Sequence, residues 1–162
     1  MTDVHSIRAA TLEDLPTLET IAVAAGMFTP EDVGMLSEQF RAAGEDDHWL
    51  VLEADGTVVG GVYYAPEPFA DRMWNLYFIA VSPQQQGHGY GQKLIRFVED
   101  TLAGRGSDVA RTMIIHTSST DAYVGSRAFY TRLGYAEEAR IRQFYGPDDH
   151  QVVFWKSLVP DA

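Results

Sequence analysis

Apolar residues recur along the chain with two kinds of spacing, and the two spacings predict a mixed α/β protein. Runs rich in β-branched and aromatic residues predict seven strands, at 6–9, 49–53, 57–64, 73–81, 111–116, 135–143 and 151–156. Apolar residues three or four positions apart predict four helices, at 12–25, 30–43, 89–103 and 126–133. A mixed sheet with helices on both faces is the economical packing for this order of elements.

The links between the elements predict strand directions and helix starts. Short links within 49–81 favour antiparallel strands. A crossover through helix 89–103 favours parallel pairing of 73–81 with 111–116. Thr11 is expected to cap the first helix, and Thr29 followed by Pro30 predicts that the second helix begins at residue 30.

The composition narrows the classes of protein. A chain of 162 residues with 46% hydrophobic residues suits one globular domain, which we expect to span 1–162. The absence of cysteine excludes disulfides, thiolate catalysis and cysteine-ligated metals. Met1 to His5 has neither a basic segment nor an apolar one, and no apolar run approaches the ~20 residues that span a bilayer, so a cytoplasmic location is expected.

The formal net charge of −11 argues against a nucleic acid or an anionic membrane as a partner, since both require clustered Lys and Arg. It is compatible with a cationic substrate such as an amine, and equally with a role in solubility alone. His5, His48 and His150 show no metal-ligand spacing with one another or with the acidic residues, so no metal is expected.

The most informative segment is Gln86-Gly87-His88-Gly89-Tyr90-Gly91, which follows the apolar run Leu76–Val81 and precedes the helical spacing of 94–102. A strand, a glycine-rich turn and a helix start direct several N–H groups and the positive helix end at one point, which suits a phosphate. Lys93 in the first helical turn opposes the helix dipole unless an anion lies nearby. The alternative is a tight turn that needs glycine for its backbone alone.

These residues resemble the GNAT superfamily of acyl-CoA-dependent N-acetyltransferases. The family signature is Gln or Arg, two residues, Gly, one residue, then Gly or Ala, and Gln86, Gly89 and Gly91 match it after a strand that ends in Ile-Ala-Val. A second family segment ends in Phe-Tyr, a spacer, Gly and an aromatic residue, and 129–135 is similar to it. The resemblance implies a central mixed sheet of about seven strands flanked by four helices.

The resemblance also implies a cosubstrate and its site. Acetyl-CoA would donate the acetyl group, its pyrophosphate would meet the backbone amides of the glycine loop, and its pantetheine arm would pair with the strand before it. The residues so implied to bind it are Ile79, Ala80, Val81, Gln86, Gly87, His88, Gly89, Tyr90, Gly91, Gln92, Tyr123 and Phe129. The acceptor would be a primary amine of a small molecule or a peptide, and the protein a monomer or homodimer.

Tyr130 is the candidate general acid, through its place in the Phe-Tyr segment. A phenol titrates near ~10 and a thiol near ~8.5, so a small shift would let a tyrosine protonate the departing sulfur. The residues alone favour a core aromatic residue at Tyr130, and its place in the Phe-Tyr segment reverses that preference. The segment departs from the family at Tyr123, where many relatives have Asn, and at Ser126, where Ala is usual.

The general base is open. Several relatives have a Glu four residues before the Ile of Ile-Ala-Val, but Asn75 stands there and cannot accept a proton near neutrality. Glu67, between two prolines, is the first candidate, Glu31 the second, and deprotonation through water the third. His116 ends a predicted strand and either lines the site or is a hydrogen-bonded core residue.

Two other functions fit the same residues. A nicotinamide-binding Rossmann domain also has glycines between a strand and a helix, but Gln92 occupies the position of its last glycine. A non-catalytic acyl-CoA sensor of the same fold is supported by Asn75, where an acid is missing, and opposed by the presence of Tyr130.

Overall fold

The computed structural model describes residues 4–159, so the predictions for Met1–Asp3 and for the last residues lie outside the described residues. The described residues form seven strands and four α-helices, together with three single turns of 3₁₀ helix. Their bounds are β1 (His5–Ala9), η1 (Leu12–Asp14), α1 (Leu15–Ala24), α2 (Gly34–Arg41), β2 (His48–Ala54), β3 (Thr57–Pro66), β4 (Met73–Val81), η2 (Pro83–Gln85), α3 (Tyr90–Gly104), β5 (Thr112–Ser118), η3 (Asp121–Tyr123), α4 (Val124–Arg132), β6 (Ala136–Gly146) and β7 (Asp149–Ser157).

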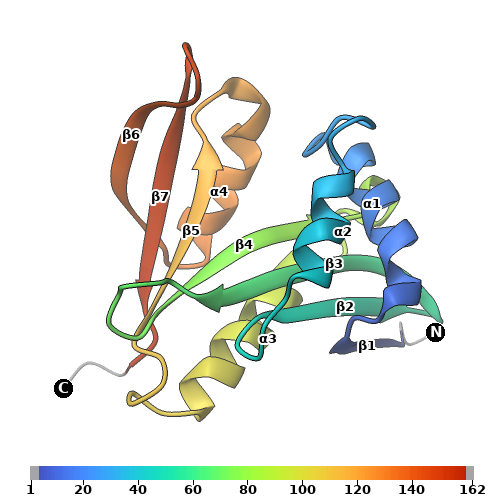
Figure 1. Cartoon of the computed structure of the whole chain (residues 1–162), viewed down its shortest axis with the longest axis horizontal. Helices are drawn as coiled ribbons and strands as arrows, with labels where there is room; N and C mark the ends of the chain where they lie inside the picture. Colours follow the sequence, from blue (N-terminus) through green and yellow to red (C-terminus); the bar gives the residue numbers. More distant parts are fainter. Residues whose placement is uncertain (1–3, 160–162) are drawn as a thin grey trace. The chain divides into compact units, whose positions relative to one another are not determined.

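The strands form one mixed sheet in the order β1-β2-β3-β4-β5-β7-β6, which confirms the predicted fold class (Figure 1). β1, β2 and β3 pair antiparallel, β4 and β5 pair in parallel, and β7 pairs antiparallel with both β5 and β6. The parallel pair is the one predicted from the crossover through α3. The chain divides into two compact units: the first holds the chain up to Ala65 with Phe78–Val98, and the second holds Pro66–Tyr77 with the chain from Glu99 onward.

In the first unit, helices pack against both faces of β3. The neighbouring glycines Gly60 and Gly61 show this, because a Cβ on Gly60 would lie 3.5 Å from Leu94 of α3 and one on Gly61 would lie 2.7 Å from Leu18 of α1. Successive Cβ atoms of a strand point to opposite faces. The absence of a side chain at Gly61 therefore lets α1 approach the strand closely, whereas at Gly60 the closest atom to such a Cβ is the Ala80 carbonyl oxygen, at 2.8 Å.

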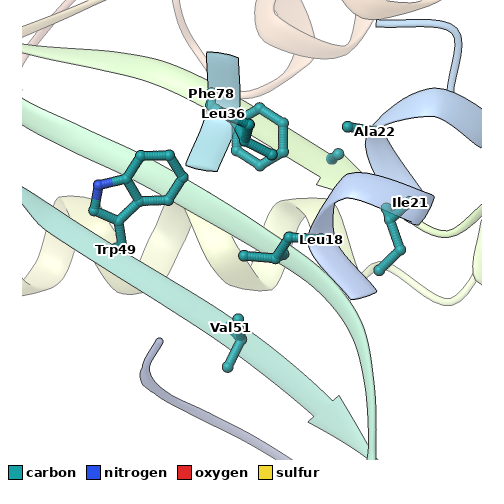
Figure 2. Packing of buried hydrophobic residues seen from close by; sticks show 8 residues of the cluster. Leu18, Ile21, Ala22, Leu36, Trp49, Val51 and Phe78 are labelled. Atoms are coloured by element: carbon teal, nitrogen blue, oxygen red, sulfur yellow. The ribbon is translucent and has the colours of Figure 1, made fainter. Parts of the chain in front are cut away.

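The core between α1, α2 and the sheet contains the apolar side chains whose helical spacing the sequence shows. Figure 2 shows Leu18, Ile21, Ala22 and Leu36 from the helices against Trp49, Val51 and Phe78 from the strands. All of these side chains are buried. Val33 and Phe40 pack against the same cluster, as their spacing with Leu36 predicts.

The predicted start of the second helix is wrong by four residues. The Thr29 hydroxyl does accept the Asp32 N–H, at 3.2 Å, as an N-cap would. However, residues 30–33 form turns in which Asp32 and Val33 both donate to the Thr29 carbonyl, and α2 begins at Gly34. Thr29 therefore closes a turn and is not the N-cap of α2, which is Val33.

In the second unit, a partly buried ion pair joins α3 to β7. Lys156 of β7 lies 3.0 Å from a Glu99 carboxylate oxygen and also donates to the Leu133 carbonyl. The Tyr135 hydroxyl donates to Glu99 at 2.6 Å. These contacts fix the chain where α4 ends, next to Gly134 with its φ of +95°. α4 is the helix that carries Tyr130.

Candidate active site

The glycine-rich segment follows η2 and runs into the first turn of α3, where the sequence predicts it. Gly87 and Gly89 have φ values of +89° and +77°, in the left-handed region that favours glycine. The Lys93 N–H donates to the Gly89 carbonyl at 3.0 Å, so the main-chain hydrogen bonding of α3 reaches back to the loop. A Cβ at either glycine would meet no described atom within 4 Å. The loop is therefore open alongside its backbone, as an anion site requires.

The Lys93 ammonium group contacts an aromatic ring of the protein itself. Its Nζ lies 5.4 Å from the centroid of the Tyr90 ring, within the range of a cation–π contact. The ring of the exposed His88 stacks on the same tyrosine at 5.5 Å. The contact with Tyr90 is sufficient to explain a cation in the first turn, so Lys93 adds little to the evidence for a phosphate.

β4 pairs with β5 along its first residues, which precede the segment Ile79–Val81. The parallel ladder joins Met73–Leu76 to Thr112–Ile115, and within the described residues it includes no residue of Ile79–Val81. The Ala80 side chain is buried in the core of the first unit. The backbone of this segment is therefore not used by β5, and a ligand with amide groups could pair with it.

Tyr130 is buried on α4, with 6% of its surface exposed. Its ring packs 5.5 Å from that of Phe154 and 5.7 Å from that of Phe129. Burial, and secondarily Tyr123, raises the pKa of Tyr130 to about 12. Among residues 4–159, no group hydrogen-bonds its hydroxyl. The phenol therefore keeps its proton and has that proton available for a ligand.

Glu67 is held by donors on both carboxylate oxygens. Asn75 Nδ2 donates to Oε1 at 3.1 Å and the Tyr77 hydroxyl donates to Oε2 at 3.0 Å. The backbone N–H of Glu67 donates to the Met73 carbonyl, which fixes the chain after β3. Asn75 itself is fully buried, and its Oδ1 has no hydrogen-bond partner. Asn75 therefore does not take the place of a catalytic acid; its amide orients the carboxylate of Glu67.

His116 lies on β5 within reach of the charge on Glu67. Burial lowers the pKa of His116, and Glu67 opposes this to a smaller extent. Gln151 of β7 places its Nε2 3.2 Å from His116 Nδ1 and 3.5 Å from the Tyr145 hydroxyl. These side chains, with Glu67 and Tyr130, all belong to the second unit.

Tyr123 lies at the start of α4, and its hydroxyl acts electrostatically on Tyr130. Burial raises the pKa of Tyr123, and Asp149 and Tyr145 add to the rise. Glu31, the second candidate base, is exposed in the turn before α2 in the first unit. The structure therefore gathers Glu67, His116, Tyr123 and Tyr130 in one unit and leaves Glu31 outside it.

The comparison with family models decides the class of protein. The model of the acetyltransferase (GNAT) family matches residues 11–135, which covers both the glycine loop and the Phe-Tyr segment. The chain belongs to the GNAT family of acetyltransferases. The family match and the mixed sheet exclude the Rossmann alternative, whose fingerprint belongs to the first βα turn of a parallel sheet. No curated protein matches the chain.

Solved structures agree with this assignment. A GNAT-family protein from Desulfovibrio desulfuricans superposes with a TM-score of 0.86 at 25% identity, over 96% of this chain and 100% of its own. The ribosomal-protein-S18-alanine N-acetyltransferase of Escherichia coli gives 0.80 at 21%, over 98% and 97% of the two chains. An aminoglycoside 6'-N-acetyltransferase in complex with coenzyme A gives 0.76 at 16%, over 97% and 99%.

Three residues of this GNAT family member were missed or undervalued from the sequence. Tyr77 carries no motif, and its contact with Glu67 depends on the turn after β3. Gln151 did give a signal, because it is a polar residue at the start of the apolar run Val152–Trp155, and it is 3% exposed. Asn75 stands where several relatives have a Glu, and the sequence alone does not show that its amide contacts the carboxylate of Glu67.

Proposed function

We propose that this chain is a single-domain N-acetyltransferase that moves the acetyl group of acetyl-CoA directly to a primary amine, with Glu67 as the base and Tyr130 as the acid. The observation that carries the proposal is the pairing of two opposite groups in one compact unit. Glu67 is a carboxylate held by two donors, and Tyr130 is a buried phenol that keeps its proton. One accepts a proton and the other supplies one, as acetyl transfer from a thioester to an amine requires.

The glycine loop and the end of β4 would hold acetyl-CoA. The N–H groups at the start of α3, from Gly89 onward, suit the pyrophosphate, and the loop next to Gln86 and His88 is open on that side. The edge of Ile79–Val81 suits the amide groups of the pantetheine arm, and an N–H on that edge would polarise the thioester carbonyl. The solved aminoglycoside acetyltransferase holds coenzyme A in the same fold.

Glu67 and Tyr130 together account for the two protons that move in the proposed reaction. The amine attacks the thioester carbonyl, the C–N bond forms and the C–S bond breaks. The proton lost by the amine goes to a carboxylate oxygen of Glu67, and the Tyr130 proton goes to the departing sulfur. Burial that raises the pKa of Tyr130 would also raise that of a thiol in the same surroundings, so the two values stay close enough for transfer.

The acceptor class is proposed from the chemistry of the site and from the relatives. Two similar structures are named for amine acceptors, an alanine of ribosomal protein S18 and an aminoglycoside. The net charge of −11 favours a cationic acceptor on approach. Within residues 4–159, no helix has the length and apolar character to cross a membrane. A cytoplasmic location and a monomeric or homodimeric state stay predictions.

Coenzyme A is expected to raise the melting temperature, and NAD is not. A ligand that binds only the folded state at a hundredfold excess over its dissociation constant stabilises it by ~2.7 kcal/mol, or about 5–10 °C for a chain of this size. Differential scanning fluorimetry with coenzyme A, acetyl-CoA and NAD at equal concentrations measures this. Stabilisation by NAD with no response to coenzyme A would contradict the proposal.

A further inference from the structure

β6 is the last strand of the sheet, and one of its two edges pairs with no described strand (Figure 1). All of its residues from Ala136 to Tyr145 are exposed, so no segment within residues 4–159 buries it. The other edge strand, β1, is partly buried, and its Arg8 forms ion pairs with Asp14 and Glu53. An uncovered edge presents unpaired N–H and C=O groups, on which a further strand can pair.

β6 carries acidic residues in its first half and basic residues in its second half. Glu137 and Glu138 are followed by Arg140 and Arg142. Among residues 4–159, none of these four side chains has an ion pair or a hydrogen bond. When two identical strands pair antiparallel, the first half of one lies opposite the second half of the other. Two copies of β6 in this arrangement therefore place acidic residues opposite basic ones at both ends.

The pairing of β6 with β7 shows which of these charges share a face. Glu137 lies opposite Phe154 and Arg140 lies opposite Val152, with a register shift next to Glu138. Phe154 and Val152 are two residues apart on β7, so they point to the same face. Because opposed residues of an antiparallel pair share a face, Glu137 and Arg140 do so as well. The other face of β6 carries Ala136, Ala139 and Ile141.

We infer that β6 is the interface between two copies of this chain, which pair antiparallel about a two-fold axis at Ala139. In this register Glu137 lies opposite Arg140 of the partner subunit, and the symmetry repeats that pair on the other side of the axis. On the other face, Ala136 lies opposite Ile141 of the partner subunit. The inference goes beyond the proposed function and does not depend on it.

The charges favour this register over the nearest ones that keep the two faces together. A shift in one direction places Glu137 opposite Glu137 of the partner subunit. A shift in the other direction places Arg140 opposite Arg140 of the partner subunit. Like charges directly opposite each other destabilise a strand pair, whereas opposite charges stabilise it. Charges on an edge strand can also serve only to prevent pairing, and the experiments below separate the two roles.

The absence of cysteine from the chain allows a test of the register itself. Ala139→Cys puts one thiol on the proposed axis, where the opposed Cα atoms would lie about 4.5–5.5 Å apart, within the range of a disulfide. Ala136→Cys is the matched control on the same face, because the two copies of that position would lie more than about 10 Å apart. Under mild oxidation of the full chain, non-reducing electrophoresis should show a covalent dimer for Ala139→Cys and a monomer for Ala136→Cys.

Charge reversal tests the pairing without a cross-link. Analytical ultracentrifugation should show a dimer of the wild type that forms with rising concentration. Glu137→Arg or Arg140→Glu alone should weaken the association at least about 10-fold, because like charges then oppose each other at both ends. An equimolar mixture of the two variants should associate as the wild type does, because each pair again joins opposite charges. Glu38→Arg and Arg41→Glu, at exposed positions of α2, should change nothing.

Three results would each overturn the inference while the proposed function stands. They are a wild type that stays monomeric at every concentration, equal cross-linking of Ala136→Cys and Ala139→Cys, and a dimer that neither Glu137→Arg nor Arg140→Glu weakens. The charges of β6 would then only protect its edge. A circular-dichroism melt of each variant shows that it is folded, and the small change in Ala139→Cys keeps the test decisive if a charge variant is not.

Discussion

Tyr130→Phe is expected to lower kcat by about 10²–10⁴-fold, the usual range for the loss of a general acid. The ring stays in its packing against Phe154 and Phe129, and no described group loses a hydrogen bond with the hydroxyl. The melting temperature should therefore be unchanged or slightly higher, and coenzyme A should bind with the same affinity. Steady-state kinetics, calorimetric titration of coenzyme A and a circular-dichroism melt measure the three quantities.

A neighbouring tyrosine provides the matched control. Tyr135 lies 6.4 Å from Tyr130, ring to ring, but its hydroxyl donates to the buried Glu99. Tyr135→Phe should lower the free energy of unfolding by about 1–3 kcal/mol and leave kcat within a few-fold of the wild type. The reverse result, with Tyr130→Phe less stable and fully active, would make Tyr130 a core residue and remove the named acid.

The pKa of Tyr130 gives the same variant a second readout. Because burial raises this pKa from its ordinary value near ~10 to about 12, the folded state disfavours the phenolate. The corresponding stability is present below pH 10 and is lost as the pH rises through 12. Tyr130→Phe should therefore lose less stability than the wild type between these values in chemical denaturation. An alkaline limb in the rate profile below pH 10 would belong to another group.

Gly89→Val is expected to weaken coenzyme A binding by about 100-fold or more. Its φ of +77° is strained for a β-branched residue, and the new side chain occupies the open space beside the loop where the phosphates would approach. Loss of two charge-assisted hydrogen bonds is sufficient for an effect of this size. Calorimetric titration of coenzyme A measures it.

Gly106→Val separates strain from ligand contact. Gly106 follows α3, has a φ of +92°, and a Cβ there would also meet no described atom within 4 Å. The two variants should therefore lose similar stability in thermal melts, whereas only Gly89→Val should lose affinity for coenzyme A. Equal affinity in a folded Gly89→Val protein would mean that the loop is a structural turn.

The order of elements could be predicted because each signal is local. β4 and α3 carry apolar residues at the spacing of a strand and of a helix, and the structure places them at Met73–Val81 and Tyr90–Gly104. The start of α2 could not be predicted, since Thr29 and Pro30 suit a turn as well as a helix start and no local signal separates the two. Boundaries depend on packing that a local pattern does not contain.

One part of the candidate site could likewise be predicted from the sequence, and another part could not. The glycine loop is a continuous segment, so its residues and their positive φ values could be expected from the sequence. The surroundings of Glu67 come from chain segments that meet only in the fold. Asn75 and Tyr77 reach its carboxylate across the turn after β3, and Gln151 reaches His116 from another strand. The residue types were visible in the sequence, but their contacts were not.

The central claim is that this chain transfers acetyl groups to amines, and one measurement tests it most directly. The purified protein is incubated with acetyl-CoA and a panel of primary amines that includes polyamines, amino acids, an aminoglycoside and a peptide with an N-terminal alanine. Release of free thiol is followed, and the product is identified by mass spectrometry. The proposal predicts at least one N-acetylated amine, formed in amounts equal to the thiol released and lost in Tyr130→Phe. Tight binding of acetyl-CoA with no amine acetylated would contradict it and favour an acyl-CoA sensor.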